Sequence, residues 1–198
     1  MKRSPILAIG TGALALGVAT LVAQARSDAQ SVLSAWPAKP QEVGREMIQK
    51  YGQPDEVTAS MMIWNGKGPW KRTILYREEV PHSFPMKHTD LLEQFVDYRV
   101  PPDRYDELAR YDGSVIVERT KGEISARCDK EEMNLLALNL SDDIVKGKRT
   151  VEGARDFYAK TAMAFKEGKR DPYTQGLRFT VAKSGTADPD REAPMKMK

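Results

Sequence analysis

Two short glycine-containing links constrain the fold of this chain more than any other feature of its sequence. They are Asn65–Pro69 and Lys121-Gly122. The segments that they join are rich in β-forming residues: 57–64 with 70–77, and 114–120 with 123–128. Two strands joined by so short a link lie antiparallel, because a parallel pair needs a crossover of a dozen residues or more. The sequence therefore predicts two β-hairpins.

Apolar residues at helical spacing predict four helices, over 41–51, 102–111, 130–146 and 150–168. Asp129 with Glu132 fits a capping box at the start of the third helix, and Thr150 fits an N-cap for the fourth. The last two helices are joined by a short loop, so we expect them to pack as an antiparallel pair.

Single strands are predicted over 95–100 and 177–182, whereas 78–90 is predicted to be an irregular connection because it contains Pro81 and Pro85. The order of these elements predicts an α+β fold. Its sheet is antiparallel or mixed and is built from two hairpins plus further strands. The helices, including the C-terminal antiparallel pair, pack on one face of that sheet.

The first 25 residues have the three-part layout of a secretory signal peptide. Lys2 and Arg3 form a basic start, 6–22 is an apolar stretch, and Ala23-Gln24-Ala25 provides a small-residue cleavage site. The alternative is an uncleaved anchor helix, since the segment is just long enough to span a bilayer. An N-terminal lipid anchor is excluded, because it needs a cysteine directly after the cleavage site and the single cysteine is Cys128. We expect a periplasmic or secreted protein with no membrane span after cleavage.

The chain that remains after cleavage is expected to form one domain, since its length normally builds a single core. Residues 26–40 and 183–198 are polar and contain two prolines each. We therefore predict a linker over 26–40, a single α+β domain over 41–182 and a disordered tail over 183–198.

The charge balance argues against a nucleic-acid partner. The formal net charge is +3, and the loss of Lys2 and Arg3 with the signal peptide lowers it by two. Binding to phosphates needs a clustered excess of lysine and arginine, and the sequence has no run of five like charges. A polybasic membrane patch is unsupported for the same reason.

A long stretch of the chain resembles exported bacterial proteins that have no assigned activity. It runs YGQPDEVTASMMIWNGKGPWKRTILYREEVPHSFPMKHTDLLEQFVDYRVPP from Tyr51 and continues in RYDGSVIVERTKGEISARCDKEE from Arg110. A narrower likeness concerns 38–76, where the helix, Gly-x-Pro stop and tryptophan-bearing strand are similar to small helix-hairpin modules of envelope-assembly lipoproteins and β-lactamase-inhibitor-like domains. This chain lacks their lipidated cysteine. The resemblance implies export and carries no activity.

Aromatic and basic residues around the first hairpin are candidate ligand-binding residues: Trp64, Trp70, Tyr76 and Arg72. Stacking faces beside cations suit sugar or peptide ligands. The structural alternative is that Trp64 and Trp70 face each other as a cross-strand pair, which is an ordinary way to stabilise a hairpin.

His82, His88 and Cys128 are the candidates for catalysis. The histidines are six residues apart with Asp90 close by, but Pro81 and Pro85 break any regular element and no i, i+4 histidine pair is present. The sequence therefore predicts no metal site and no cofactor. A thiol enzyme would need one of the histidines beside Cys128 in space.

These observations favour a non-catalytic binding or interaction module of the bacterial cell envelope, with an envelope protein, a peptide or a glycan as partner. The alternative is a small periplasmic hydrolase or thiol enzyme that uses Cys128 with His82 or His88. The two differ in space: an enzyme brings these side chains into one pocket, whereas a binding module exposes an apolar or aromatic patch.

Overall fold

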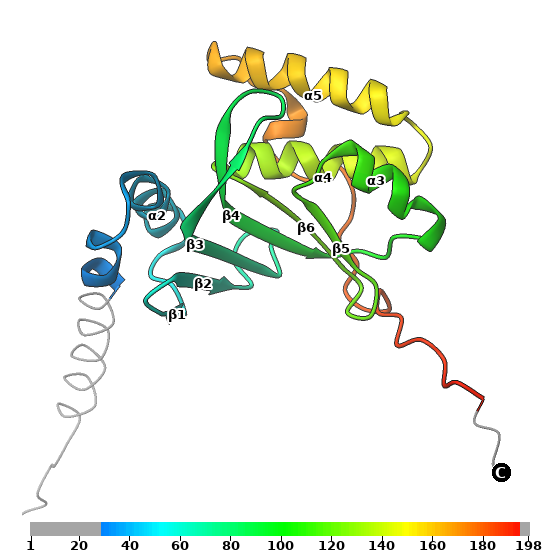
Figure 1. The fold of residues 1–198 in the computed structure, drawn as a ribbon, viewed down its shortest axis with the longest axis horizontal. Coiled ribbons are helices and arrows are strands. Elements are labelled where there is room, and N and C mark those ends of the chain that lie inside the picture. Colours follow the sequence, from blue (N-terminus) through cyan, green and yellow to red (C-terminus); the bar gives the residue numbers. More distant parts are fainter. Residues whose placement is uncertain (1–28, 195–198) are drawn as a thin grey trace, which may run out of the picture.

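The computed structural model describes residues 29–194, so the predicted signal peptide, 1–25, lies outside the described residues. Six antiparallel strands form one sheet in the order β1-β2-β3-β4-β6-β5 (Figure 1). The strands are β1 (Glu56–Val57), β2 (Met61–Asn65), β3 (Arg72–His82), β4 (His88–Asp97), β5 (Val115–Glu118) and β6 (Glu123–Cys128). Both predicted hairpins are present, as β2–β3 and β5–β6.

The helices are α2 (Ala38–Tyr51), α3 (Tyr105–Tyr111), α4 (Glu131–Val145) and α5 (Val151–Lys166), with short 3₁₀ turns at η1 (Pro102–Arg104) and η2 (Pro172–Thr174). On α2, a Cβ added to Gly44 would lie 3.1 Å from Cδ2 of Leu75 on β3. On α4, the Asn134 amide donates to Oε1 of Gln94 on β4, at 3.0 Å. Gln94 shares a face with Leu92, the cross-strand partner of Leu75, so α2 and α4 cover the same face of the sheet. The predicted α+β fold is confirmed.

The covered face carries two groups of buried apolar side chains. One lies under α2 and includes Trp64 and Leu75. The larger one lies between β4, β6 and the helices α3, α4 and α5, and includes Leu136 and Leu140. Ile124 and Cys128 belong to this second group and lie on the covered face of β6, opposite Val96 and Leu92 of β4.

The segment 78–90, which we predicted to be irregular, is mostly strand. β3 continues to His82 and β4 begins at His88, with Pro81 paired opposite Thr89. β2 pairs with β3 only as far as Tyr76, so the outer part of β3 has a free edge. Proline is tolerated there because its missing N–H removes no bond to another strand. Pro81 therefore did not mark a loop, whereas Pro85 lies in the turn between β3 and β4.

The predicted strand over 177–182 is absent, because this segment makes no strand pairing. Its backbone is held instead by a side chain: the N–H of Arg178 donates to Oδ1 of Asn139, at 2.6 Å. Phe179 packs edge-on against Tyr98 at 5.2 Å between ring centroids. The apolar residues of the segment thus reflect packing against the domain rather than membership of the sheet.

The boundaries of the domain are wider than predicted. Within the predicted linker, 29–34 is helical and Leu33 and Trp36 are buried in the group under α2. Within the predicted tail, the N–H of Asp188 donates to the Arg119 carbonyl at 3.2 Å, and its carboxylate pairs with the Arg119 guanidinium at 2.9 Å. Both flanks therefore contribute to the folded unit.

The two predicted caps have different outcomes. Oγ1 of Thr150 accepts from the N–H of Gly153 at 3.1 Å, which confirms the cap of α5. The capping box of Asp129 and Glu132 is wrong, because the N-cap of α4 is Lys130 and no side chain caps it.

None of the helices among residues 29–194 has both the length and the apolar character that a membrane span requires.

Candidate functional site

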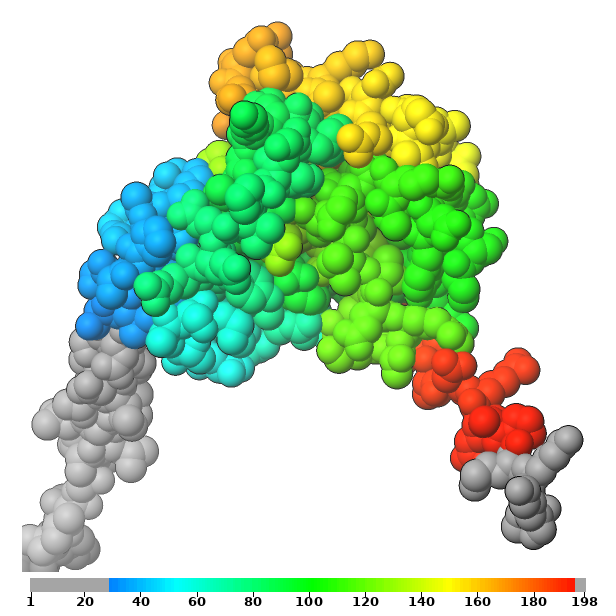
Figure 2. Space-filling model, in the orientation of Figure 1, coloured from blue at the N-terminus to red at the C-terminus, as the bar shows by residue number. Residues whose placement is uncertain are grey.

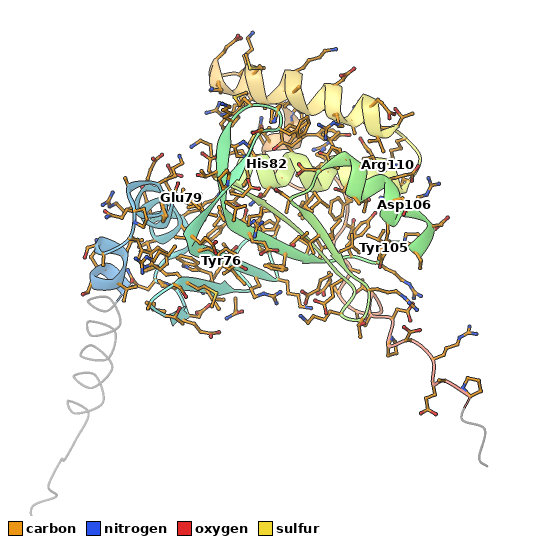
Figure 3. The ribbon with its side chains drawn as sticks, in the orientation of Figure 1. Tyr76, Glu79, His82, Tyr105, Asp106 and Arg110 are labelled. Atoms are coloured by element: carbon orange, nitrogen blue, oxygen red, sulfur yellow. The ribbon has the colours of Figure 1, made fainter. Side chains whose placement is uncertain are left out.

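The pairing of β3 with β4 places the two histidines of the chain side by side. His82, the last residue of β3, is the cross-strand partner of His88, the first residue of β4. Their ring centroids are 4.9 Å apart. Figure 3 shows His82 farther along β3 towards α5 than Tyr76. Asp90 follows two residues after His88 and so lies on the same side of β4.

Asp90 is the buried centre of this group, with 2% of its surface exposed. Its Oδ1 lies 3.1 Å from Nε2 of His88, and its Oδ2 lies 3.2 Å from Nδ1 of His82. Oδ2 also accepts a hydrogen bond from Oγ of Ser114. Nε2 of His82 lies 3.8 Å from a carboxylate oxygen of Asp112. We call these five residues, from β3, β4 and the segment before β5, the His–Asp cluster.

Ion pairing and burial shift the pKa values of the ionisable side chains in the His–Asp cluster. The ion pair with Asp90 raises the pKa of His88 to about 11, and Cys128 adds to the rise against the effect of burial. Burial alone would raise the pKa of Asp90, but His88 and Ser114 outweigh it and lower that pKa. Burial raises the pKa of Asp112. A protonated His88 therefore neutralises Asp90.

Cys128 lies next to His88, as the thiol-enzyme alternative requires, whereas His82 does not line the cavity described below. The thiol is 5% exposed and donates to Oδ1 of Asp129 at 3.7 Å. Burial raises its pKa, although His88 acts in the opposite direction. The pair has the composition of a thiol nucleophile and its base, but the buried thiol is held in its neutral form.

A cavity of about 200 Å³ opens beside Cys128 and His88. Its walls come from the tip of the β3–β4 hairpin, the start of α4 and one side of α5. The apolar lining residues are Pro85, Met86, Met133, Tyr158, Ala162 and Phe165, and three lysines border them: Lys87, Lys130 and Lys166. His82 does not line this cavity. The sequence therefore named two of its polar residues, Cys128 and His88.

The hairpin tip is fastened to α5 by aromatic contacts. Phe84 packs against Tyr158 at 5.2 Å between ring centroids, and the guanidinium of Arg155 lies 3.8 Å from the Phe84 ring centroid. In the space-filling view, the tip rests against α5 on the surface of the molecule (Figure 2). The cavity is thus bounded by packed elements on both sides.

The four candidate ligand-binding residues do not form one site. Trp64 and Trp70 are buried on the covered face of the sheet, and Trp64 pairs with Thr73 rather than with Trp70. The predicted cross-strand tryptophan pair is therefore wrong, because Trp70 precedes β3 and turns under α4. Neither indole offers a free stacking face.

Tyr76 and Arg72 lie on the opposite, uncovered face of the sheet. The Tyr76 hydroxyl donates to Glu93 at 2.9 Å. The Arg72 guanidinium pairs with Glu123 at 2.9 Å and lies 4.0 Å from the Phe95 ring centroid. The sheet itself separates these two residues from the tryptophans, so they cannot contact one ligand together.

Sequence reasoning missed Asp112 and Ser114, which reach the His–Asp cluster only through the pairing of β5, β6 and β4. A signal for the histidine pair did exist: five residues between two β-forming runs is an ordinary hairpin loop length. No signal in the sequence placed Asp112 or Ser114 near Asp90.

Searches with this chain match no family model, no curated protein and no solved structure.

Proposed function

We propose that this protein is exported and acts as a non-catalytic binding protein of the bacterial cell envelope. Its ligand site is the cavity between the β3–β4 tip, α4 and α5, and the ligand is a small apolar molecule that carries a carboxylate. The export part of the proposal rests on the signal-peptide layout of residues 1–25. The binding part rests on one observation, an apolar cavity bordered by three lysines.

The size of the cavity limits the ligand. An apolar cavity of roughly 150 Å³ holds a benzene molecule, so a volume of about 200 Å³ accommodates a single ring with a small substituent or a short alkyl chain. Methionine and aromatic side chains dominate the walls, and such walls adapt to ligands of slightly different shape. A folded peptide or an oligosaccharide is too large for this site.

Charge defines the polar end of the ligand. Within residues 29–194, Lys87, Lys130 and Lys166 form no ion pair. Asp129, the acid that lines the cavity, is paired with Lys39 at 3.0 Å. The border of the cavity therefore carries unneutralised positive charge, which favours an anionic group on a ligand whose apolar part is buried.

The test is calorimetric titration with two matched pairs of probes, benzoate against benzamide and hexanoate against hexanamide. The carboxylates should bind more tightly than the amides of equal size. Lys87→Ala and Lys166→Ala should each weaken carboxylate binding about 2- to 5-fold, since an exposed ion pair contributes up to about 1 kcal/mol. Lys160→Ala, on α5 but outside the cavity lining, is the control and should change nothing.

Ala162→Met tests the position of the ligand, because Ala162 lines the cavity and a longer side chain there fills it. This variant should abolish binding of all four probes while its melting temperature stays within a few degrees of the wild type. Binding that survives in Ala162→Met, or affinities that are equal for acids and amides, would refute the proposed ligand site.

A second candidate function is a thiol enzyme, and one observation favours it: Cys128 and His88 border the same cavity. A ligand in the cavity would therefore lie beside a thiol and an imidazole, which is the arrangement that nucleophilic catalysis uses. The two functions differ in the reactivity of Cys128. An accessible, reactive thiolate supports the enzyme, and a sheltered thiol supports the binding protein.

A further inference from the structure

We infer that His82, His88 and Asp90 bind one divalent transition-metal ion, with Zn²⁺ as the best match to their donor atoms. One ligand atom from each of the three side chains lies within 4.8 Å of the other two. The sequence has no pair of histidines at helical spacing, but the pairing of β3 with β4 brings the two histidines together across a hairpin. This metal site shares His88 with the ligand site proposed above, whereas His82 and Asp90 do not line that cavity.

Two buried atoms in the group lack hydrogen-bond partners when the His88 ring is neutral. They are Nε2 of His88 and Oδ1 of Asp90. The two atoms lie 3.1 Å apart, and the Asp90 side chain is 98% buried, so neither atom is satisfied by solvent. An unsatisfied buried polar atom is costly in free energy. Two ligands that are each about 2.0–2.2 Å from one tetrahedral Zn²⁺ lie roughly 3.3–3.5 Å apart, which is close to the observed separation.

The other polar atoms of these side chains are already held as the outer contacts of a metal site would hold them. Nδ1 of His88 lies 2.8 Å from the carbonyl oxygen of Met86, which can only accept, so Nδ1 carries a proton. In the neutral ring this leaves the lone pair on Nε2, the atom that faces Asp90. Metal-bound histidines nearly always donate their second ring N–H in this way.

Ser114 holds Asp90, and Asp112 faces His82 at ion-pair rather than hydrogen-bond distance. Oδ2 of Asp90 accepts from Ser114 Oγ, which fixes the carboxylate and leaves Oδ1 directed at His88. Nδ1 of His82 lies 3.2 Å from Asp90, while its Nε2 is directed towards Asp112 at 3.8 Å. A carboxylate behind a metal-bound imidazole orients the ring and strengthens it as a ligand.

The donor set and the charge select the kind of ion. Two imidazoles and one carboxylate suit Zn²⁺ and neighbouring divalent transition metals, whereas Mg²⁺ and Ca²⁺ prefer sites made of oxygen. Asp90 and Asp112 bring two carboxylates into a buried region, which a dication would neutralise. Three protein ligands are the number found in zinc sites that keep a position for water or a substrate.

The experiment uses the exported protein without a polyhistidine tag, stripped with a chelator and titrated with Zn²⁺ by calorimetry and with Co²⁺ by absorption. We expect one ion per chain. His82→Gln and Asp90→Asn should each weaken Zn²⁺ binding by about 100-fold or more, because even changes to outer contacts cost about 10- to 100-fold. Asp112→Asn should fall in that 10- to 100-fold range. Asp97→Asn is the matched control, an acid of β4 on the opposite face, and should bind like the wild type.

Proton NMR of the wild type provides a readout that no folding defect can affect. The chain has two histidines, so each imidazole signal can be followed individually. Both signals should shift or broaden on addition of one equivalent of Zn²⁺ or Co²⁺, respectively. Cys128→Ser should retain binding, since the thiol is not one of the three ligands. Unmoved imidazole signals, absence of saturable binding in the wild type, or equal affinities in His82→Gln and Asp97→Asn would each overturn the inference.

Discussion

The indole N–H of Trp70 donates a hydrogen bond to Oε1 of Glu131, at 2.8 Å, and joins the loop after β2 to the first residue of α4. The same oxygen accepts from the hydroxyl of Tyr51 at 2.5 Å, and Nζ of Lys50 lies 2.8 Å from the other carboxylate oxygen. Glu131 is 5% exposed. Burial and the contact with Glu131 together raise the pKa of Tyr51. One buried carboxylate thus connects α2, the first hairpin and α4.

Trp70→Phe should destabilise the protein more than Trp64→Phe. Both tryptophans are almost fully buried, but Trp64 donates to a neutral acceptor, the carbonyl of Gly52, at 2.9 Å. A hydrogen bond to a charged group contributes about 1.5–3 kcal/mol and one to a neutral group about 0.5–1.5 kcal/mol. Urea unfolding of both variants measures the difference. Equal losses of unfolding free energy would show that the charge of Glu131 adds nothing to the contact.

Leu140→Ala should lower the free energy of unfolding by about 2–5 kcal/mol, which is a large fraction of the total for a single domain. Leu140 has no exposed surface and lies on α4 in the larger apolar group. Ile116→Ala is the control, since Ile116 is 53% exposed on the uncovered face of the sheet and its truncation should cost little. A wild-type melting curve for Leu140→Ala would contradict the packing of α4 against β6.

Local patterns were sufficient to predict most of the fold, because caps, stops and tight turns act within a few residues. Gly52 ends α2 with a φ of +82° and Gly122 turns the second hairpin with a φ of +66°, and both were recognisable as glycine positions. The failures are non-local. Pro81 is compatible with β3 only because β2 has already ended, and the apolar residues around Phe179 pack on Tyr98 instead of pairing with a strand.

The candidate site was only partly predictable for the same reason. His88 and Cys128 were recognised as residue types, but their proximity arises because Cys128 pairs with Leu92 on the next strand. The hydrogen bond from Ser114 to Asp90 likewise joins residues that are 24 positions apart in the chain. A single sequence contains no record of such pairings, whereas the hairpin that joins His82 to His88 was within reach of local rules.

Glu123 should make the stability of the protein dependent on pH in the acidic range. Burial by itself raises its pKa, but hydrogen bonds from Lys71 and Arg72 outweigh burial and lower that pKa below 4.5. A carboxylate with a lowered folded-state pKa stabilises the fold above its unfolded-state pKa, and this contribution is lost as the pH falls through the folded-state value. Glu123→Gln should therefore be less stable than the wild type at pH 7, and the gap should narrow below about pH 4.5.

Chemical unfolding at a series of pH values checks this prediction. Glu118→Gln is the control, because Glu118 is the cross-strand partner of Glu123 but its side chain is 47% exposed and, among residues 29–194, forms an ion pair only with Lys121. That variant should track the wild type throughout. A gap between the wild type and Glu123→Gln that stays constant from pH 7 to pH 3 would show that Lys71 and Arg72 do not depress the pKa of Glu123.

Expression with the native N-terminus in a bacterial host tests whether the protein is exported and cleaved. Cleavage after Ala25 should yield a protein that begins near Arg26 and is recovered from the periplasm or the medium. Mass spectrometry of the intact protein identifies the first residue. Changing Ala23 and Ala25 to large residues should block processing, whereas Ala→Ser at the same positions should not. An intact Met1 terminus in the membrane fraction would instead support the anchor alternative.

Cys128 distinguishes the binding protein from the enzyme. Its thiol is 5% exposed and packs in the larger apolar group, so a thiol reagent should label the native protein much more slowly than the urea-unfolded protein. Cys128→Ser should reduce the free energy of unfolding, because it places a more polar group among apolar neighbours. Benzoate should slow native labelling further, since Cys128 borders the cavity that the probe would fill. Rapid native labelling that persists below pH 7 would reveal a reactive thiolate. In that case the pairing of Cys128 with His88 serves catalysis, and the cavity is a substrate site rather than the site of a ligand that does not react.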